Sequence, residues 1–330
     1  MGRQQSKVRF DFVVIFLVSI LVCTLTSFCF GAEDPSKYPS RPITLIVAWP
    51  PGGGSDLACR KIAELAGKIL NEQILVVNKA GGAGVIGTTA LVNAEPDGYT
   101  IGNVTSSTMV ITPNLRSVPF NPTKDFTFIV QIAEYPMPFC VKTDSRWKSF
   151  KEFADEARKN PEKLTYSTAG PLSIAHMFVE QIALEENIKI THIPVQGDSE
   201  LIAQLLGGHL DAGLSNAMTP YVTSGKLRAL AVASGSRIKD IPNILTFTEL
   251  GYKASMDPFF GLAAPKGLNP LVLRKLQEAF KKAWEDPVFQ EFEPAAGHTP
   301  VFKDSETFTR YVLKEYDEKG KLLKKLGFVK

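Results

Sequence analysis

Residues 43–104 read ITLIVAWPPGGGSDLACRKIAELAGKILNEQILVVNKAGGAGVIGTTALVNAEPDGYTIGNV, and they alternate short apolar runs with helical patterns. A β-α-β-α-β order of this kind predicts a parallel sheet with helices on its faces. The continuous apolar runs predict buried strands, and apolar residues at helical spacing predict helices. The strands are expected at 43–48, 74–77 and 99–104, and the helices at 56–70 and 85–94.

The same alternation restarts further along the chain and predicts a second α/β unit, followed by a C-terminal helical piece. We therefore expect two doubly wound α/β domains. Ligands bind such sheets at the carboxyl ends of the strands, and two facing edges form a cleft that a hinge can close. The further strands are expected at 126–133, 139–141, 164–167, 190–194, 210–214, 227–233 and 259–264, and the further helices at 149–159, 174–187, 199–206, 220–224, 271–284 and 307–326.

Composition excludes several classes of protein. The chain has 330 residues, of which 44% are hydrophobic and 22% are charged, with a formal net charge of +3. This balance excludes a wholly disordered chain, a collagen-like fibre and a polytopic membrane protein. The small and dispersed charge argues against a nucleic-acid surface.

The first 31 residues have the pattern of a secretory signal peptide. Arg3, Lys7 and Arg9 form a basic head, and an apolar run of twelve residues follows at 12–23. Cys29 and Gly31 are the small residues expected before a cleavage site, so we expect cleavage after Gly31. An uncleaved membrane anchor is the alternative, but the apolar run is shorter than the ~20 residues that a span needs.

Removal of residues 1–31 lowers the formal charge to +1 and leaves two cysteines, Cys59 and Cys140. Two cysteines do not make a disulfide framework, and we expect both to be small buried apolar residues. We expect an exported, monomeric protein with two domains. The domain boundaries are expected at 32–133 with 257–330 for the first domain and 134–256 for the second.

The first candidate site is the loop at 49–56, WPPGGGSD, between a predicted strand and a predicted helix. Its glycines let the backbone approach a ligand closely, and the helix start that follows offers free N–H groups to an anion. Ser55 and Asp56 are the residue types expected to cap this helix. A tight turn that merely caps the helix is the equal alternative. The loop lacks the lysine of a phosphate-binding Walker loop.

A second glycine-rich loop has the spacing of a dinucleotide fingerprint. Gly82, Gly84 and Gly87 follow a predicted strand and precede a predicted helix. The acidic residue expected about 20 residues later, at the end of the next strand, is missing, because that strand ends in Gly-Asn-Val-Thr at 102–105. We therefore expect a closely packed turn, with an exported NAD-dependent oxidoreductase as the alternative.

A third loop, STAGPLS at 167–173, repeats the small and hydroxyl residues of the first loop and also ends in a helix. His176 lies one turn into that helix, where a structural hydrogen bond is the more common role. Hydroxyl and amide side chains follow other predicted strands, in the segments 105–108, 196–198 and 216–219. The residues that we expect to bind ligand are Pro51, Gly52, Gly53, Gly54, Ser55, Asp56, Ser106, Thr168, Ala169, Gly170, Ser173, His176, Gln196 and Asn216.

The chain lacks the side-chain sets of common catalytic and metal sites. It has no Cys/His cluster with metal-ligand spacing, no Gly-x-Ser-x-Gly elbow and no pair among its four histidines at helical spacing. Several strand-end loops with free N–H groups and hydroxyls therefore predict a binding cleft for a small anion. We expect no enzymatic activity, no cofactor and no metal.

The whole chain from Tyr38 to Lys330 resembles the tripartite tricarboxylate transporter substrate-binding proteins, the Bug or TctC-like family. No single motif is decisive, but their order and spacing are specific. The matching segments are YPSRPI at 38–43, PPGGGSD at 50–56 with Arg60, NKAGGAG at 78–84, PDGYT at 96–100, YSTAG at 166–170 with His176, LLGGHLD at 205–211, GKLRALAV at 225–232, FGLAAP at 260–265, and Gly297.

The resemblance implies a periplasmic binding protein of the Venus flytrap type, similar to type II. It would deliver a small organic carboxylate to a two-component membrane permease. In the family, two strand–helix loops hold the ligand carboxylate largely through hydrogen bonds and water, and these loops match 51–56 and 168–173 here. A periplasmic module that reports its ligand to a two-component sensor would have the same binding properties, so it stays open as an alternative.

The chain departs from the family at two places that we expect to border the cleft. Val195 and Gln196 replace the common Tyr-Lys pair, and Phe259 stands where the family often has Trp. The loss of an aromatic residue and a cation indicates a ligand that differs from the common dicarboxylates.

Overall fold

The computed structural model describes residues 34–254, 256, 258–295, 297–325 and 327–329. The predicted signal peptide, residues 1–31, lies outside this part of the chain. The chain divides into two compact units, Met1–Tyr38 and Pro39–Lys330. The described residues of the first unit form a turn, in which Lys37 N–H donates to the carbonyl of Asp34 at 2.8 Å.

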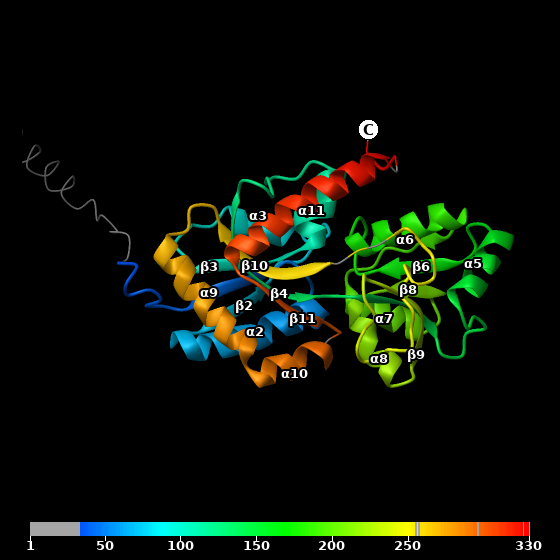
Figure 1. The fold of residues 1–330 in the computed structure, drawn as a ribbon, viewed down its shortest axis with the longest axis horizontal. Helices are drawn as coiled ribbons and strands as arrows, with labels where there is room; N and C mark the ends of the chain where they lie inside the picture. The colour runs from blue at the N-terminus through cyan, green and yellow to red at the C-terminus, as the bar shows by residue number, and fades with distance from the viewer. Residues whose placement is uncertain (1–33, 255, 257, 296, 326, 330) are drawn as a thin grey trace, which may run out of the picture. The chain divides into compact units, whose positions relative to one another are not determined.

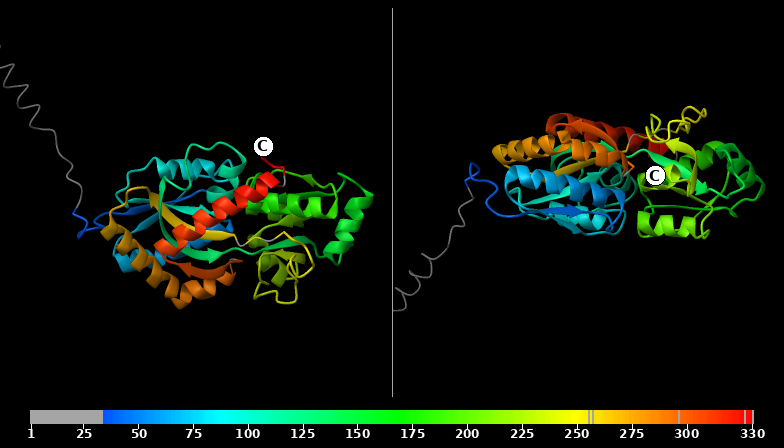
Figure 2. Two further views of the ribbon diagram at one scale, coloured as in Figure 1. Left: turned by 45° about the horizontal axis from the view of Figure 1, so that its top comes forward. Right: turned by 90° about the horizontal axis from the view of Figure 1, so that it is seen from below.

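Two sheets form the framework of the second unit (Figure 1). The first sheet has six strands in the order β11-β4-β10-β3-β1-β2, and the second has five in the order β7-β6-β8-β5-β9. The chain passes from the first sheet to the second between β4 and β5 and returns between β9 and β10 (Figure 2). The structure thus confirms the two predicted α/β units, each of which consists of one sheet and the helices that pack on it.

The elements of the first sheet come from both ends of the chain. They are β1 (Ile43–Val47), α2 (Gly54–Leu70), β2 (Ile74–Asn78), α3 (Val85–Val92), β3 (Thr100–Thr105), the π-helix η1 (Ser107–Ile111), α4 (Thr112–Leu115), β4 (Phe126–Glu134), β10 (Phe259–Pro265), α9 (Pro270–Glu285), α10 (Pro287–Ala295), β11 (Thr299–Lys303) and α11 (Ser305–Lys325).

The elements of the second sheet are contiguous in sequence. They are β5 (Met137–Lys142), α5 (Phe150–Lys159), β6 (Thr165–Thr168), α6 (Ile174–Glu186), β7 (Thr191–His192), α7 (Asp198–Leu206), β8 (Ala212–Leu214), the 3-10 helix η2 (Asn216–Met218), α8 (Thr219–Thr223) and β9 (Leu227–Ala233).

Strand direction is mixed in both sheets. β1 pairs in parallel with β2 and β3, as the sequence of 43–104 predicts. β10 inserts between β3 and β4 and runs antiparallel to both, and β5 runs antiparallel to β8 and β9. The sequence pattern marks these strands as buried but does not carry their direction, because apolar side chains on both faces suit either pairing.

Helices cover both faces of each sheet. In the first sheet, α2 packs with α9 on one side, while α3 and α11 lie on the other (Figure 1). In the second sheet, consecutive residues of β5 point to opposite faces. Phe139 joins the aromatic cluster under α5 and α6, and Cys140 joins the aliphatic cluster under α7.

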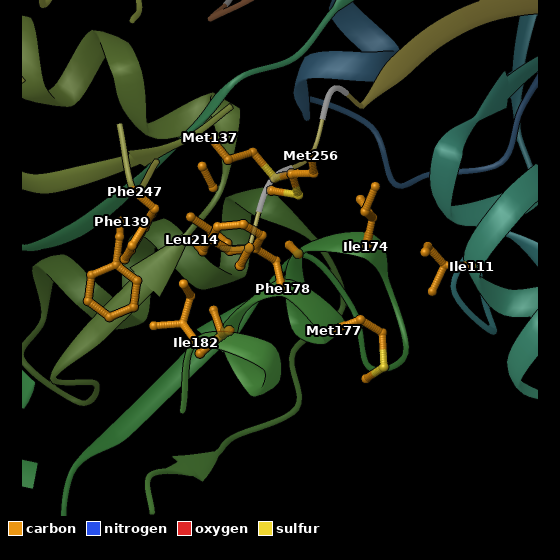
Figure 3. Close-up of a cluster of buried hydrophobic side chains, with 14 of the residues drawn as sticks. Ile111, Met137, Phe139, Ile174, Met177, Phe178, Ile182, Leu214, Phe247 and Met256 are labelled. Atoms are coloured by element: carbon orange, nitrogen blue, oxygen red, sulfur yellow. The ribbon is translucent and has the colours of Figure 1, made fainter. Parts of the chain in front are cut away.

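The aromatic cluster holds the second sheet to its helices (Figure 3). The ring of Phe247 lies 5.2 Å from Phe178 of α6 and 6.3 Å from Phe139 of β5, both at steep angles. Figure 3 also labels Met137, the first residue of β5, and Met256, on the segment between β9 and β10. Both methionines are buried members of the same hydrophobic cluster.

Several elements have no counterpart in the sequence prediction, among them η1, α4, α10 and the edge strand β11. Two of these, α10 and β11, bear on the site. α10 contains Pro294, which breaks the helical pattern that sequence reasoning looks for. β11 is the segment TPVFK, which lacks the continuous apolar run that marks a buried strand. Together they bring Glu293 and His298 close to the start of α2.

Candidate functional site

Strand ends from both sheets converge on one cavity. It encloses about 450 Å³ of empty space, including the part that is open to solvent. Strands β1, β3, β6 and β8 all end at it, as expected for a site at the carboxyl ends of parallel strands. The lining residues are Trp49, Ser55, Thr105, Ser107, Tyr135, Met137, Ala169, Ser173, Ile174, Ala175, Asp198, Leu214, Ser215 and Asn216.

The first loop is fixed from behind by Asp56. Helix α2 begins at Gly54 with Gly53 as its N-cap, and no side chain caps it. The prediction that Ser55 or Asp56 caps the helix is therefore wrong. The buried Asp56 carboxylate instead accepts the Gly52 N–H at 2.9 Å, and Gly52 has a φ of 79° that favours glycine. No side chain at the N-cap position therefore accepts a hydrogen bond from the first N–H groups of α2.

The third loop, at 167–173, brings the start of α6 to the cavity. Ser173 caps this helix, because its hydroxyl accepts the His176 N–H at 3.3 Å. The Ile174 N–H donates to the Ser107 hydroxyl at 3.1 Å, which ties α6 to the first sheet's η1. Ala175 is buried at the cavity, so a further first-turn N–H group lies there.

His176 does not line the cavity. Its Nδ1 accepts the Leu172 N–H at 3.0 Å, and its ring stacks on His192 with 3.9 Å between centroids. Burial and the neighbouring His176 lower the pKa of His192 to about 4. Thr168 donates to the Gly170 carbonyl at 3.0 Å and also lies 3.2 Å from His192 Nε2. These residues shape the loop rather than face the cavity.

Three residues of the lining carry buried polar atoms that find no hydrogen-bond partner among the described residues. These groups are the Trp49 indole N–H, the Tyr135 hydroxyl and the Asn216 amide nitrogen. Burial raises the pKa of Tyr135 to about 12, although the nearby Ser106 and Thr105 act in the opposite direction. The phenol is therefore a neutral donor. Buried donors without partners are costly unless another molecule accepts from them.

One acid reaches the cavity, Asp198 at the start of α7. The Ser215 hydroxyl donates to its Oδ1 at 2.5 Å. Burial raises the pKa of Asp198, while Ser215, the Gly54 N–H and the charge of His298 act to lower it. No lysine or arginine is among the described residues that line the cavity.

The structure gathers part of the predicted site. Ser55, Ala169, Ser173 and Asn216 line the cavity. The backbone of Gly53 and Gly54 is buried beside it, against Asp198 and Asn216. The remaining predicted residues lie off the lining: Pro51, Gly52, Asp56, Ser106, Thr168, Gly170, His176 and Gln196.

Three of those residues have other tasks. Gln196 is exposed, and its N–H donates to Glu200 at 2.7 Å. The Ser106 hydroxyl accepts the Phe259 N–H at 2.8 Å, which joins η1 to β10. Pro51 is exposed and is not among the residues that line the cavity.

The expectation that Val195 and Phe259 border the cleft is wrong. Val195 is buried in the aliphatic core under α7. Phe259 is fully buried, with its ring 5.3 Å from Phe308 and 5.8 Å from Tyr311 of α11. The expectation rested on the family resemblance, but both side chains are buried in packed cores and neither is among the residues that line the cavity.

Trp49, Tyr135 and Asp198 were not among the residues predicted to bind ligand. Each lies within two residues of a strand end or begins a helix, which is the signal that could have found them. Tyr135 comes after β4, whose turn toward β5 shows only in the three-dimensional structure. Asp198 stands in the 196–198 segment noted above, where Gln196 was the residue chosen.

The glycines of the second loop serve packing. A Cβ at Gly87 would lie 2.7 Å from the Ala48 Cα and 2.7 Å from the Lys79 carbonyl oxygen, and one at Gly84 would lie 2.4 Å from the Thr108 methyl. α3 therefore sits against the end of β1 because these positions have no side chain. This supports the packed turn over the dinucleotide loop.

Cys59 and Cys140, the two cysteines among the described residues, are buried free thiols, as predicted. Burial raises both thiol pKa values. Within the described part of the chain, no three His, Cys, Asp or Glu side chains are placed to hold a metal ion. Across the same residues, no helix combines the length and apolar character needed to cross a membrane.

The family model described as "Tripartite tricarboxylate transporter family receptor" matches residues 58–328. This chain belongs to that family. A Cupriavidus necator protein named "UPF0065 protein in gbd 5'region" is 34% identical to the receptor over 295 residues, which cover 89% of this chain and 90% of that protein.

Solved structures share the two-sheet arrangement. The periplasmic binding protein BugD matches with a TM-score of 0.84 and 30% identity, over 88% of this chain and 99% of that chain. The Rhodopseudomonas palustris protein Rpa4515, solved with adipate, matches with a TM-score of 0.83 and 23% identity, over 88% and 98%. The receptor therefore has the two-domain α/β fold of periplasmic binding proteins.

Proposed function

We propose that this receptor binds a small organic carboxylate in the cavity between the two sheets and presents it to a membrane permease of a tripartite transporter. The observation that carries the proposal is the convergence of donors on one cavity. The starts of α2 and α6 meet the unpartnered polar groups of Trp49, Tyr135 and Asn216 there. N–H groups at helix starts and neutral side-chain donors can hold an anion without a basic side chain.

We further propose that the domains comprise 32–133 with 257–330 and 134–256, and that the ligand favours the closed state. The lining residues come from elements of both sheets. A ligand that contacts both sides binds the closed form better and shifts the population toward it. The permease then needs to recognise only the closed shape.

The proposal places the working protein in the periplasm, after export and cleavage near Gly31. Membership of a transporter receptor family supports both the location and the permease partner. The adipate seen in Rpa4515 supports including dicarboxylates among the ligands tested.

A thermal-shift panel tests binding. The purified protein is unfolded and refolded to remove bound ligand, then screened with C3–C8 mono-, di- and tricarboxylates, aromatic acids, amino acids and NAD. A ligand at ~100 times its dissociation constant adds about 2.7 kcal/mol of stability, so a saturable rise in Tm for one class of acid is expected. A rise with NAD alone would contradict the proposal.

Substitution of one cap tests the site. Ser173→Asp keeps a good N-cap for α6 but places a carboxylate at the helix start, where the ligand's carboxylate would compete with it. We expect affinity to fall at least tenfold with little loss of stability. Ser149→Asp is the matched control, because Ser149 caps α5 away from the cavity by the same kind of hydrogen bond. Equal affinities of the two variants would sink the site assignment.

A further inference from the structure

Asp198 puts the chain's own carboxylate where an anion would be expected to bind. Its Oδ2 lies 3.0 Å from the position that a Cβ on Gly53 would take, at the N-cap of α2. Burial raises the pKa of Asp198, and the Gly54 N–H, which faces the same carboxylate, acts against that shift. The positive end of α2 is thus already compensated by a carboxylate of the second sheet's domain.

The groups around Asp198 do not compensate the negative charge of further anionic groups. The cavity lining contains this one carboxylate and, among the described residues, no lysine or arginine. His298 lies nearby, but its Nδ1 is 2.9 Å from Glu293 Oε2, and both side chains are buried. A protonated His298 would therefore be neutralised by Glu293 rather than by a ligand.

A dicarboxylate would bring two negative charges beside an acid in a cavity without a basic side chain. Buried like charges without compensation are unfavourable, or force one group to take up a proton. A ligand with one carboxylate and one ammonium avoids this cost. Its carboxylate would accept hydrogen bonds from the start of α6 and the Trp49 and Tyr135 donors, while its ammonium would donate to Asp198.

We infer that the ligand is a zwitterionic amino acid and that Asp198 is the residue that selects it over a dicarboxylate. The inference rests on the proposed function, because it assumes that the cavity holds a small carboxylate. Ser215 is a positioning residue, since its hydroxyl orients the Asp198 carboxylate.

Matched pairs of ligands test the inference on the unmodified protein. Each pair replaces an ammonium by a carboxylate on the same methylene chain: β-alanine with succinate, 4-aminobutyrate with glutarate, and 5-aminopentanoate with adipate. The pair of alanine and propanoate compares a ligand that has an α-ammonium group with one that lacks it. Calorimetric titration of the refolded protein is expected to give at least tenfold tighter binding for the amino acid of the best-binding pair.

Asp198→Asn then tests the residue. The amide keeps the size of the side chain and removes its charge, so the amino acid is expected to lose at least tenfold in affinity while the matching dicarboxylate gains. Asp144→Asn, at an exposed position in the same domain, is the control for loss of one negative charge. Tm without ligand shows whether each variant is folded, and the comparison of ligands on the unmodified protein stands without any variant.

The outcomes separate the two proposals. Tighter binding of a dicarboxylate by the unmodified protein would leave the proposed function standing and overturn the role of Asp198. Unchanged selectivity in Asp198→Asn would overturn it as well, as would equal binding of alanine and propanoate where that pair binds best. Failure of every carboxylate and amino acid to bind would overturn both proposals.

Discussion

Asp56 Oδ1 lies 2.9 Å from Arg60 Nη2, one turn further along helix α2. The same buried carboxylate accepts hydrogen bonds from the Gly52 N–H at 2.9 Å and from the Asn78 amide at 2.8 Å. Asn78 also donates to the Trp49 carbonyl. One acid therefore fixes the loop, the helix and the end of β2 relative to one another, directly behind the cavity.

Asp56→Asn is expected to lower the free energy of unfolding by about 2–3 kcal/mol, because it breaks a buried charge-assisted network. Urea unfolding of the two proteins at neutral pH measures the difference. Asp317→Asn is the control: it breaks an exposed pair with Lys321 on α11, and its effect is expected to stay below about 0.5 kcal/mol. Equal effects of the two substitutions would contradict the role given to Asp56.

The same network predicts acid sensitivity. Burial raises the pKa of Asp56, but hydrogen bonds from Arg60, Gly52 and Asn78 outweigh it and lower the pKa below the usual 3.8. A carboxyl with a lowered pKa in the folded state stabilises the protein above its unfolded pKa. We expect the difference between unmodified protein and Asp56→Asn to be full at pH 7 and to shrink as the pH falls below about 3.8. A difference that stays constant down to pH 3 would contradict the assignment.

The Asp56 network also shows how far sequence reasoning reaches. The glycine loop, the strand before it and the helix after it follow from local patterns, and the structure confirms all three. The capping residue cannot be predicted from the local pattern, because the Asp56 carboxylate can accept hydrogen bonds either from a nearby N–H group or from groups that are distant in sequence. Arg60 is one turn away in sequence, but Asn78 reaches it only through the pairing of β1 with β2.

The cavity lining shows the same limit. Ser55 and Ser173 stand at predicted strand–helix junctions, so the pattern finds them. Tyr135 and Asp198 become neighbours of those junctions through the packing of one sheet's edge against the other, which no local pattern encodes. For Phe259 the error is the reverse: it was expected at the cleft but lies outside it. The antiparallel insertion of β10 places its side chain in the core under α11.

His192 predicts a second, distinct effect of pH on stability. Its pKa is lowered by burial and by His176 from 6.5 to about 4. The unfolded chain therefore takes up a proton before the folded chain does, and stability falls as the pH drops from 6.5 toward 4. With screening by solvent, the loss is about 1–2 kcal/mol. Urea unfolding midpoints across this range are expected to vary less in His192→Gln than in the unmodified protein.

The exposed His209 provides the control for that experiment. His209→Gln removes a histidine from the same domain without touching the stacked pair, so its pH profile is expected to follow that of the unmodified protein. Parallel profiles for all three proteins would show that His192 does not carry the effect.

Two glycine substitutions are expected to separate binding from folding. A Cβ at Gly54 would lie 2.7 Å from Asn216 Nδ2 and 3.0 Å from His298 Nε2, at the cavity. Gly54→Ala is therefore expected to weaken ligand binding about tenfold. A Cβ at Gly87 would meet the backbone of Ala48 and Lys79, so Gly87→Ala is expected to cost about 1–3 kcal/mol in stability. Calorimetric titration and urea unfolding of both variants measure the two effects, and a reversed assignment would contradict the site.

The Tyr135 hydroxyl can be tested by a substitution that removes a single oxygen atom. It is buried at the cavity without a hydrogen-bond partner among the described residues. If it donates to the ligand's carboxylate, Tyr135→Phe removes a charge-assisted hydrogen bond worth about 1.5–3 kcal/mol, which is roughly a 10- to 150-fold loss of affinity. The stability of the ligand-free protein is expected to hold or rise, because a buried polar group without a partner is removed.

Tyr166→Phe is the matched control for that loss. The Tyr166 hydroxyl donates to Glu180 at 2.5 Å and lies outside the cavity lining. Its removal leaves the Glu180 carboxylate with one donor fewer, so it is expected to lower stability by about 1 kcal/mol and to leave affinity within threefold. Calorimetric titration and urea unfolding on both variants distinguish the two roles. If Tyr135→Phe lost stability and kept its affinity, the hydroxyl would belong to the packing of the domains and not to the ligand.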